Sequence, residues 1–181
     1  MLDRVAMDAF DQAFGFVITS EGGYSADQAD PGNWTGGRCG AGECRGTNWG
    51  ISAAAYPQLD IRALTEAQAM EIYRRDYWDR AGCGHMPPPL ALLVFDAAVN
   101  NGVGRAVRWL QAALGVAQDG AVGPATLAAV QARAGQGGAL CAEFQARRLA
   151  FMAGLPTWRA FGAGWARRLC ALPFQAVQME G

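Results

Sequence analysis

The feature that most constrains the fold is a segment that is apolar on nearly every side, residues 90–99. The three prolines directly before it, at positions 87–89, interrupt any preceding helix and suit the start of a new one. A helix that is hydrophobic all round has to be enclosed by other structure. We therefore expect a central buried helix here, with the other helices packed around it as a bundle.

Helical spacing of apolar residues also marks the first segment, from Leu2 to Ile18, with acidic residues on the opposite face. Residues 25–50 are rich in Gly, Asp, Asn and Pro and have no helical period, which predicts a long loop or a small irregular β-lobe. The predicted fold class is all-α, with at most a short hairpin in that loop. Thr65 is a candidate N-cap. Further helices are expected over 64–78, 104–114, 124–134, 139–153 and 157–171.

Length and composition set broad limits. The chain has 181 residues, of which 51% are hydrophobic, so it can bury a core as one domain or as one domain with a small appendage. No apolar run approaches the roughly 20 residues that span a bilayer. The N-terminus lacks a basic stretch followed by an apolar block, so we expect no secretory signal. We expect a protein made in the cytoplasm that needs another route to any substrate outside it.

Charge is distributed unevenly along the chain. Residues 1–80 carry 12 acidic side chains and 7 arginines, whereas residues 81–181 carry 4 and 8. A basic C-terminal surface would suit an anionic polymer such as a cell wall, although a solvated helical face explains it equally well. The cysteine spacings are irregular and His85 is the only histidine, so we expect no zinc site.

Glu21 is the informative residue of the first helix. The apolar face runs through Phe10, Phe14 and Val17, and the next position on that face is Glu21. Burial and the partial negative charge of a helix C-terminus would both raise the pKa of a carboxyl there. An acid that stays protonated near neutral pH can donate a proton to a glycosidic oxygen. The alternative is a last-turn glutamate that faces water or pairs with an arginine.

Three short stretches carry a family resemblance. Residues 21–24 (Glu-Gly-Gly-Tyr), 30–32 (Asp-Pro-Gly) and 47–52 (Thr-Asn-Trp-Gly-Ile-Ser) resemble glycoside hydrolase family 108. The family comprises N-acetylmuramidases, or lysozymes, of phage lysis cassettes and related bacterial loci, and the acid of its EGGY motif is regarded as catalytic. The resemblance therefore implies a lysozyme-like fold and a peptidoglycan-cleaving endolysin, with Glu21 as its general acid.

The resemblance covers about residues 10–170. Residues 95–102 are similar to the start of the family's C-terminal peptidoglycan-binding region, and Gly164-Trp165 and Arg168 also fit. The rhythm of Leu110-Gln111, Asp119-Gly120 and Gly123 is similar to that of peptidoglycan-binding modules, and is partly a packing signature. We expect a lysozyme-like catalytic region over 1–89 and a helical peptidoglycan-binding region over 90–181, packed as one compact unit. The implied partner is peptidoglycan, with no nucleic acid, metal or other cofactor. We expect a monomer, delivered by a holin or a phage-like particle to the periplasm or the cell wall.

The predicted catalytic residues are Glu21, Asp30 and Thr47, and Asp27 and Glu43 are alternatives for the second carboxylate. About a dozen residues are inserted between Asp30 and Thr47 relative to the family pattern. Thr35 therefore stands at the family's spacing, but Thr47 has the family's sequence context, and we prefer Thr47. The predicted substrate-binding residues are Tyr24, Trp49, Tyr77, Trp78 and Asn100. Aromatic side chains at such positions can stack on a sugar ring, although a core role is at least as good for Tyr77 or Trp78.

Three other functions are compatible with parts of the sequence. A Cys/His peptidase acting on the wall's peptides would need Cys83 and His85, which lie in a turn rather than at a helix start. A wall-binding module without catalysis would use residues 95–130 and would leave Glu21 unexplained. A lytic transglycosylase would cut the same bond with one acid and release 1,6-anhydro ends.

Cys39 and Cys44 flank the inserted Gly-rich loop, and we expect them to form a disulfide only in an oxidising environment. Five cysteines and no predicted secretory signal indicate a chain that folds reduced. The intact masses of protein purified with and without reductant should differ by one disulfide bond. Free thiols at both positions after oxidation would contradict this expectation.

Overall fold

The computed structural model describes residues 8–19 and 23–179, and contacts within the chain divide it into two units. The helical unit comprises Met1–Ala13 and Arg74–Gly181, and the lobe unit comprises Phe14–Tyr73. Strands in the described part of the chain are limited to one two-residue pair, so the prediction of an all-α fold with a small β-lobe is confirmed. Among the described residues no helix is both long and apolar enough to cross a bilayer.

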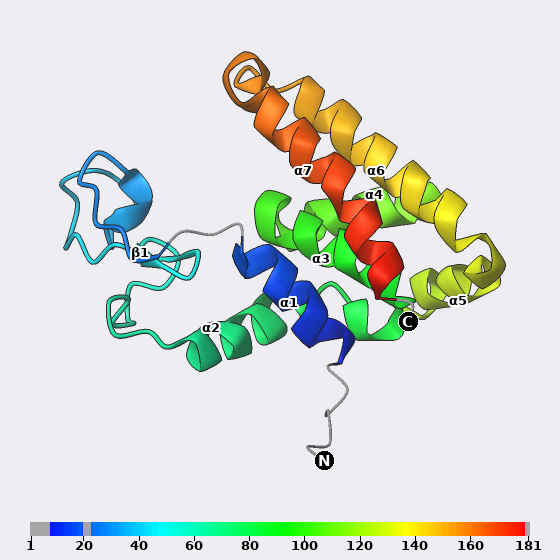
Figure 1. Ribbon diagram of the computed structural model, residues 1–181, viewed down its shortest axis with the longest axis horizontal. Helices are drawn as coiled ribbons and strands as arrows, with labels where there is room; N and C mark the ends of the chain where they lie inside the picture. Colours follow the sequence, from blue (N-terminus) through cyan, green and yellow to red (C-terminus); the bar gives the residue numbers. More distant parts are fainter. Residues whose placement is uncertain (1–7, 20–22, 180–181) are drawn as a thin grey trace. The chain divides into compact units, whose positions relative to one another are not determined.

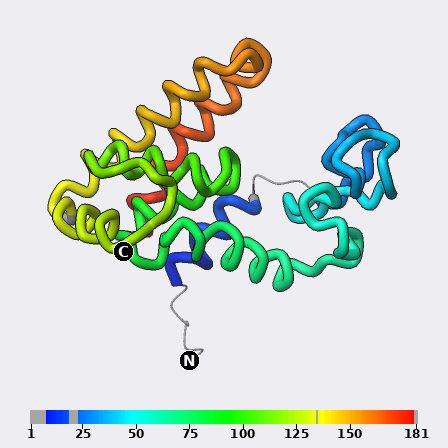
Figure 2. The backbone as a smooth tube through the Cα atoms, turned by 180° about the vertical axis from the view of Figure 1, so that it is seen from behind, coloured from blue at the N-terminus to red at the C-terminus, as the bar shows by residue number. Residues whose placement is uncertain are grey.

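The centre of the helical unit is α3, Pro88–Asn101 (Figure 1). Every residue from Leu90 to Ala98 is buried, which confirms the predicted central helix. Three helices pack around it, and the last two of them, α6 and α7, form a long antiparallel pair that is also visible from behind in Figure 2. These three are α4 (Val103–Leu114), α6 (Gly137–Ala153) and α7 (Trp158–Gln178). The shorter elements of this unit are η2 (Arg74–Asp79), η3 (Cys83–His85), α5 (Pro124–Ala132) and η4 (Ala134–Gln136).

Helix α1, Ala9–Thr19, contributes to both units, because the division falls after Ala13. In the helical unit, Phe10 packs edge-to-face against Trp78 of the π-helix η2 and Phe95 of α3, with ring centroids 5.4 and 5.8 Å away. In the lobe unit, Phe14 packs in the same way against Tyr73, at 5.5 Å. The apolar face that the sequence predicted is therefore buried over the described part of α1.

Helix α7 continues to Gln178, so the prediction that it ends at residue 171 is wrong. A proline inside a helix cannot donate a hydrogen bond to the carbonyl four residues earlier. For Pro173 that carbonyl belongs to Leu169, and the side-chain Nε2 of Gln145 on α6 donates to it at 3.2 Å. The neighbouring helix thus supplies the donor that the proline lacks.

The lobe unit contains a two-stranded antiparallel hairpin, β1 (Thr47–Asn48) and β2 (Ile51–Ser52), slightly later in the chain than predicted. Its other regular elements are the 3₁₀ turn η1 (Pro31–Asn33) and α2 (Glu66–Tyr73). The predicted cap of α2 forms a reciprocal capping box. The amide N of Gln68 donates to the hydroxyl of Thr65 at 3.3 Å, and the amide N of Thr65 donates to Oε1 of Gln68 at 3.0 Å.

A buried carboxylate joins three helices of the helical unit. Asp96 on α3 is fully buried and accepts hydrogen bonds from Arg148 on α6, at 2.6 Å, and from Nε of Arg168 on α7, at 2.8 Å. Arg148 is itself buried and also donates through Nε to Oδ1 of Asn101, at 2.9 Å. Removing one member of a buried ion pair leaves an uncompensated charge in the core, and this is more costly than losing an exposed pair.

We expect Asp96→Asn to lower the free energy of unfolding by about 3–5 kcal/mol, because two guanidinium groups would lose their carboxylate in the core. The matched control is Asp8→Asn, since Asp8 pairs with Arg74 at 2.8 Å on the surface and is 53% exposed. This change should cost less than about 1 kcal/mol. Urea unfolding of both variants gives the comparison, and equal losses would contradict a special role for the buried carboxylate.

Candidate active site

Glu21, the predicted general acid, lies outside the described residues, as do Ser20 and Gly22. The site is therefore built from the residues that follow it in the lobe unit. Tyr24, Asp30, Thr47 and Trp49 all belong to that unit.

The chain that leaves the EGGY motif is paired with β1. Ser25 and Thr47 form an antiparallel bridge, in which the amide N of Ser25 donates to the Thr47 carbonyl at 2.9 Å and the amide N of Thr47 donates to the Ser25 carbonyl at 2.8 Å. This pairing brings the predicted catalytic threonine to within one residue of Tyr24, although 23 positions separate them in the sequence.

Buried Asn33 connects Thr47 to the acidic loop. The hydroxyl of Thr47 donates to Oδ1 of Asn33 at 2.7 Å, and Nδ2 of Asn33 donates to the carbonyl of Asp27 at 2.9 Å. The backbone carbonyl of Asn33 also accepts from the amides of Arg45 and Gly46. Sequence reasoning missed Asn33. The signal that could have identified it is its place directly after the Asp-Pro-Gly step, where a polar residue precedes a Trp.

The insertion folds into a closed loop of its own. Trp34 and Cys44 form an isolated bridge at its base, and the amide N of Thr35 donates to the carbonyl of Glu43 at 2.9 Å. The hydroxyl of Thr35 accepts from the amide N of Glu43 at 2.9 Å and thus serves to close this loop. The loop leaves the contact between Thr47 and Asn33 intact. This geometry favours Thr47 over Thr35 as the functional threonine.

The three candidates for the second carboxylate differ in their hydrogen bonds. Oδ1 of Asp30 caps the turn η1 by accepting from the amide N of Gly32 at 2.8 Å, and Oδ1 of Asp27 accepts from the amide N of Ala29 at 2.9 Å. Glu43 is 71% exposed at the surface of the inserted loop and forms an ion pair with Arg45 at 2.7 Å. In both of these hydrogen bonds the aspartate accepts through Oδ1. Asp30 stays our prediction for the second carboxylate.

Tyr24 lies over a glycine that the fold requires. Gly46 has a φ of +84°, and a Cβ placed on it would lie 2.7 Å from the Tyr24 ring and 2.5 Å from the Ser25 carbonyl oxygen. The guanidinium of Arg62 lies 5.5 Å from the centre of the same ring, and Tyr24 is 40% exposed. The structure therefore holds an exposed aromatic ring at the last position of the EGGY motif, as a sugar-stacking role requires.

Trp49 is the one described non-glycine residue with a positive φ, 53°. It forms the hairpin loop with Gly50, and such a conformation costs about 1–3 kcal/mol for a bulky residue. Two hydrogen bonds hold it there. Nε1 of Trp49 donates to the carbonyl of Leu64 at 3.0 Å, and the hydroxyl of Tyr73 donates to the carbonyl of Trp49 at 3.1 Å. The substrate-binding role of Trp49 stays a prediction.

The other predicted substrate-binding residues belong to the helical unit. Trp78 is 4% exposed and packs against Phe10 and Phe95, so the structure gives it a core role. Tyr77 on the same π-helix is half-buried, and its sugar-stacking role stays a prediction. Asn100 is exposed at the end of α3, where its Nδ2 donates to the carbonyl of Asp96 at 2.8 Å. It lines a cavity of about 360 Å³.

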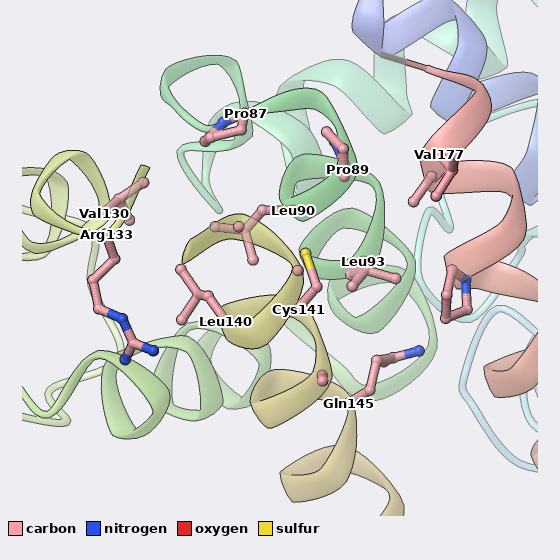
Figure 3. Close-up of a pocket in the computed structure, with 15 residues that line it drawn as sticks. Pro87, Pro89, Leu90, Leu93, Val130, Arg133, Leu140, Cys141, Gln145 and Val177 are labelled. Atoms are coloured by element: carbon pink, nitrogen blue, oxygen red, sulfur yellow. The ribbon is translucent and has the colours of Figure 1, made fainter. Parts of the chain in front are cut away.

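A second cavity of the helical unit, about 390 Å³, lies between α3, α6 and the end of α7 (Figure 3). Its walls are mainly apolar, with Leu90, Leu93 and Leu140 among them. Arg133 is also present, but its NH1 donates to the carbonyl of Ala113 and its Nε to Gln136. No carboxylate is found among the described residues that line this cavity, so it does not resemble a glycosidase site.

The surroundings of the Cys83 thiol oppose a nucleophilic role. Cys83 is fully buried, and burial raises the pKa of its thiol, which the negative charge of Asp79 raises further. This is the opposite of what a thiolate nucleophile requires, and it counts against the peptidase alternative. Cys39 and Cys44 are both free. Within the described ranges, no group of three or more His, Cys, Asp or Glu side chains could hold a metal ion.

The Leu-Gln, Asp-Gly rhythm has a structural basis. Buried Gln111 on α4 donates through Nε2 to Oδ1 of Asp119 at 2.6 Å, and its Oε1 accepts from the amide N of Gly120 at 2.9 Å. Asp119 also accepts from the amide N of Ala121 at 2.9 Å, which forms an Asx turn. The hydrogen bonds from Ala121 and Gln111 lower the pKa of Asp119. These residues hold α4 to the turn that precedes α5.

Comparisons with known proteins found two matching family models and a similar solved structure. A family model described as glycosyl hydrolase 108 matches residues 14–102, and one described as a predicted peptidoglycan domain matches residues 105–170. Among solved structures, the chain is similar to SagA of Brucella abortus, with 34% sequence identity, 94% of each chain covered and a TM-score of 0.77. None of the curated proteins matches the chain. The division by role into residues 1–89 and 90–181 stays a prediction.

The cap at Asp30 generates a stability prediction. Asp30→Ala should lower the free energy of unfolding by about 1 kcal/mol, because the amide of Gly32 loses its acceptor. Asp30→Asn is the matched control and should leave stability unchanged, since asparagine caps as well as aspartate does. Thermal unfolding of both variants measures this. Equal losses would mean that the negative charge of Asp30, rather than its capping oxygen, stabilises the lobe.

Proposed function

Because the chain belongs to the glycosyl hydrolase 108 family, we propose that it is a lysozyme-type N-acetylmuramidase, with Glu21 as its general acid. Family membership and the peptidoglycan-domain match establish the coarser statement, a glycosidase-family hydrolase of peptidoglycan with a peptidoglycan-binding region. The proposal adds the bond, which joins N-acetylmuramic acid to N-acetylglucosamine, and the acid that protonates its oxygen.

The pairing of Ser25 with Thr47 is the observation that supports this proposal most directly. It brings Tyr24, the last residue of the EGGY motif, and the Thr-Asn-Trp-Gly-Ile step to the same place in the lobe despite the insertion between them. The hydroxyl proton of Thr47 is used by Asn33, so its oxygen lone pairs can accept a hydrogen bond from a water or a sugar hydroxyl. Asp30 would stabilise positive charge on the sugar or orient the attacking water.

A lytic transglycosylase is the alternative that differs least from this proposal. It would use the same acid and the same bond, and only the products distinguish the two reactions. Hydrolysis leaves reducing N-acetylmuramic acid ends, whereas transglycosylation leaves 1,6-anhydro ends. A peptidase would leave new amino termini, and a binding module would leave the wall uncut.

The place of action is a further part of the proposal. We propose that the protein is made in the cytoplasm and acts as a monomer on peptidoglycan in the periplasm or at the cell wall. A holin or a phage-like particle would release it there. Eight of the 15 arginines, against four of the 16 acidic residues, fall in residues 81–181, and a basic surface supports contact with an anionic wall.

We expect Glu21→Gln to slow the clearing of purified cell walls by about 10²–10⁴-fold, because the variant cannot donate the proton that the leaving oxygen needs. Its melting temperature should be unchanged or higher, since the substitution removes a carboxyl from a position that disfavours charge. Asp30→Asn should slow clearing less than Glu21→Gln does. Turbidity measurements and mass spectrometry of the products test both variants.

The matched control is Glu71→Gln, the same change at an exposed glutamate of α2, which should clear walls at the wild-type rate. If Glu21→Gln also cleared at that rate, the assignment of the acid would be wrong. If the products carried only new amino termini, the protein would be a peptidase rather than a glycosidase.

A further inference from the structure

One face of α7 is apolar along its whole length, but it is buried only in its second half. The side chains on this face follow one another at spacings of three or four residues, and they are Trp158, Phe161, Trp165, Leu169, Leu172 and Ala176. The last three are buried. Phe161 is 57% exposed, and Trp158 and Trp165 are half-buried. The first half of the apolar face is therefore accessible to a ligand.

The length of the α6–α7 pair explains this difference. Helix α7 packs against α3 and α6, and the turn between α6 and α7, drawn in orange, lies away from α3 in Figures 1 and 2. Trp165 is level with the end of α3, because it lines the same cavity as Asn101. Trp158 and Phe161 come earlier in α7 and so lie closer to the turn.

Trp158, Phe161 and Trp165 form a continuous row of rings, which we call the aromatic stripe. The ring centroids of Trp158 and Trp165 are 6.1 Å apart, and those of Phe161 and Trp165 are 6.0 Å apart with an angle of 30° between the planes. Gly162 makes room for this row, since a Cβ placed on it would lie 2.6 Å from the Trp158 ring. A larger residue at position 162 would displace the indole from the surface of the helix.

The change from aliphatic to aromatic side chains along this face bears on the kind of ligand. The flat face of an aromatic ring carries partial negative charge. The C–H groups on one face of a pyranose carry partial positive charge, because the ring carbons are bonded to oxygen, and such a face can stack on an aromatic ring. Leu169 and Leu172 pack against other helices, whereas every member of the exposed stripe is aromatic. This composition favours a sugar as the ligand.

Groups that can bind sugar hydroxyls lie at one end of the aromatic stripe. Trp165 lines the cavity of about 360 Å³, together with Asn100 and Thr157. Their amide and hydroxyl groups can both donate and accept hydrogen bonds, as the hydroxyl and N-acetyl groups of an amino sugar require. The match to the predicted peptidoglycan domain ends at residue 170, so it includes the stripe and excludes the exposed Phe174 farther along α7.

We propose that the aromatic stripe binds the glycan strand of peptidoglycan by stacking on its sugar rings. The inference rests on the proposed function, because peptidoglycan is the substrate that supplies such a strand. The stripe belongs to the helical unit, whereas the predicted catalytic residues Asp30 and Thr47 belong to the lobe unit. Stacking on sugar faces needs no particular peptide, so this site would hold the strand whatever its cross-links are.

Titrations that follow tryptophan emission test this proposal, with the peptide-free disaccharide that has N-acetylmuramic acid at its reducing end. This disaccharide lacks the bond that the proposed reaction cleaves, so binding is measured without turnover. Phe161→Ala should raise the dissociation constant by about 3- to 10-fold, through loss of one aromatic contact. Phe161→Leu should weaken binding as much, because leucine keeps an apolar surface but has no ring face, whereas Phe161→Tyr should bind as the wild type does.

The matched control is Phe174→Ala. Phe174 is 74% exposed and lies on the opposite face of the same helix, at a spacing of nine residues from Trp165. This variant loses an exposed ring of the same kind and should bind the disaccharide as the wild type does.

Unchanged binding by Phe161→Ala would overturn the proposal, and so would wild-type binding by Phe161→Leu, because apolar contact rather than stacking would then hold the ligand. A wild-type dimer that Phe161→Ala dissociates, detected by sedimentation velocity, would assign the stripe to contact between copies of this chain and would overturn the proposal as well. The glycosidase proposal is tested separately, by wall clearing and its products. Failure of the stripe as a glycan site is therefore distinguishable from failure of the proposed reaction.

Discussion

The buried carboxylate of Asp96 is the interaction on which the helical unit depends. It lies on the central helix α3 and contacts an arginine on each of the two long helices, α6 and α7, so one side chain fixes three helices relative to each other. Apolar packing around α3 supplies most of the driving force for folding, but it is non-directional. The ion network restricts the orientation of the helices, because a guanidinium can bind a carboxylate in only a few geometries.

The lobe unit is organised by polar contacts rather than by a large apolar core. Asn33 joins the acidic loop, the start of the hairpin and the base of the insertion through its side chain and its carbonyl. The strained backbone of Trp49 persists because contacts from Leu64 and Tyr73 hold it in place. A loop region with this many internal hydrogen bonds can hold functional side chains in fixed positions while tolerating an insertion of about a dozen residues.

Much of the fold was predictable because hydrophobic periodicity records which helix faces are buried. The central helix, the Thr65 cap and the Asx turn at Asp119 all follow from local sequence. The continuation of α7 past Pro173 was not predictable, since the missing donor comes from Gln145, 28 positions earlier. The roles of Asn33 and Arg148 were not predictable for the same reason, because they depend on partners that are distant in sequence. Motifs suggested the site residues of the lobe, but only the structure shows that Thr47 adjoins the residue after Tyr24.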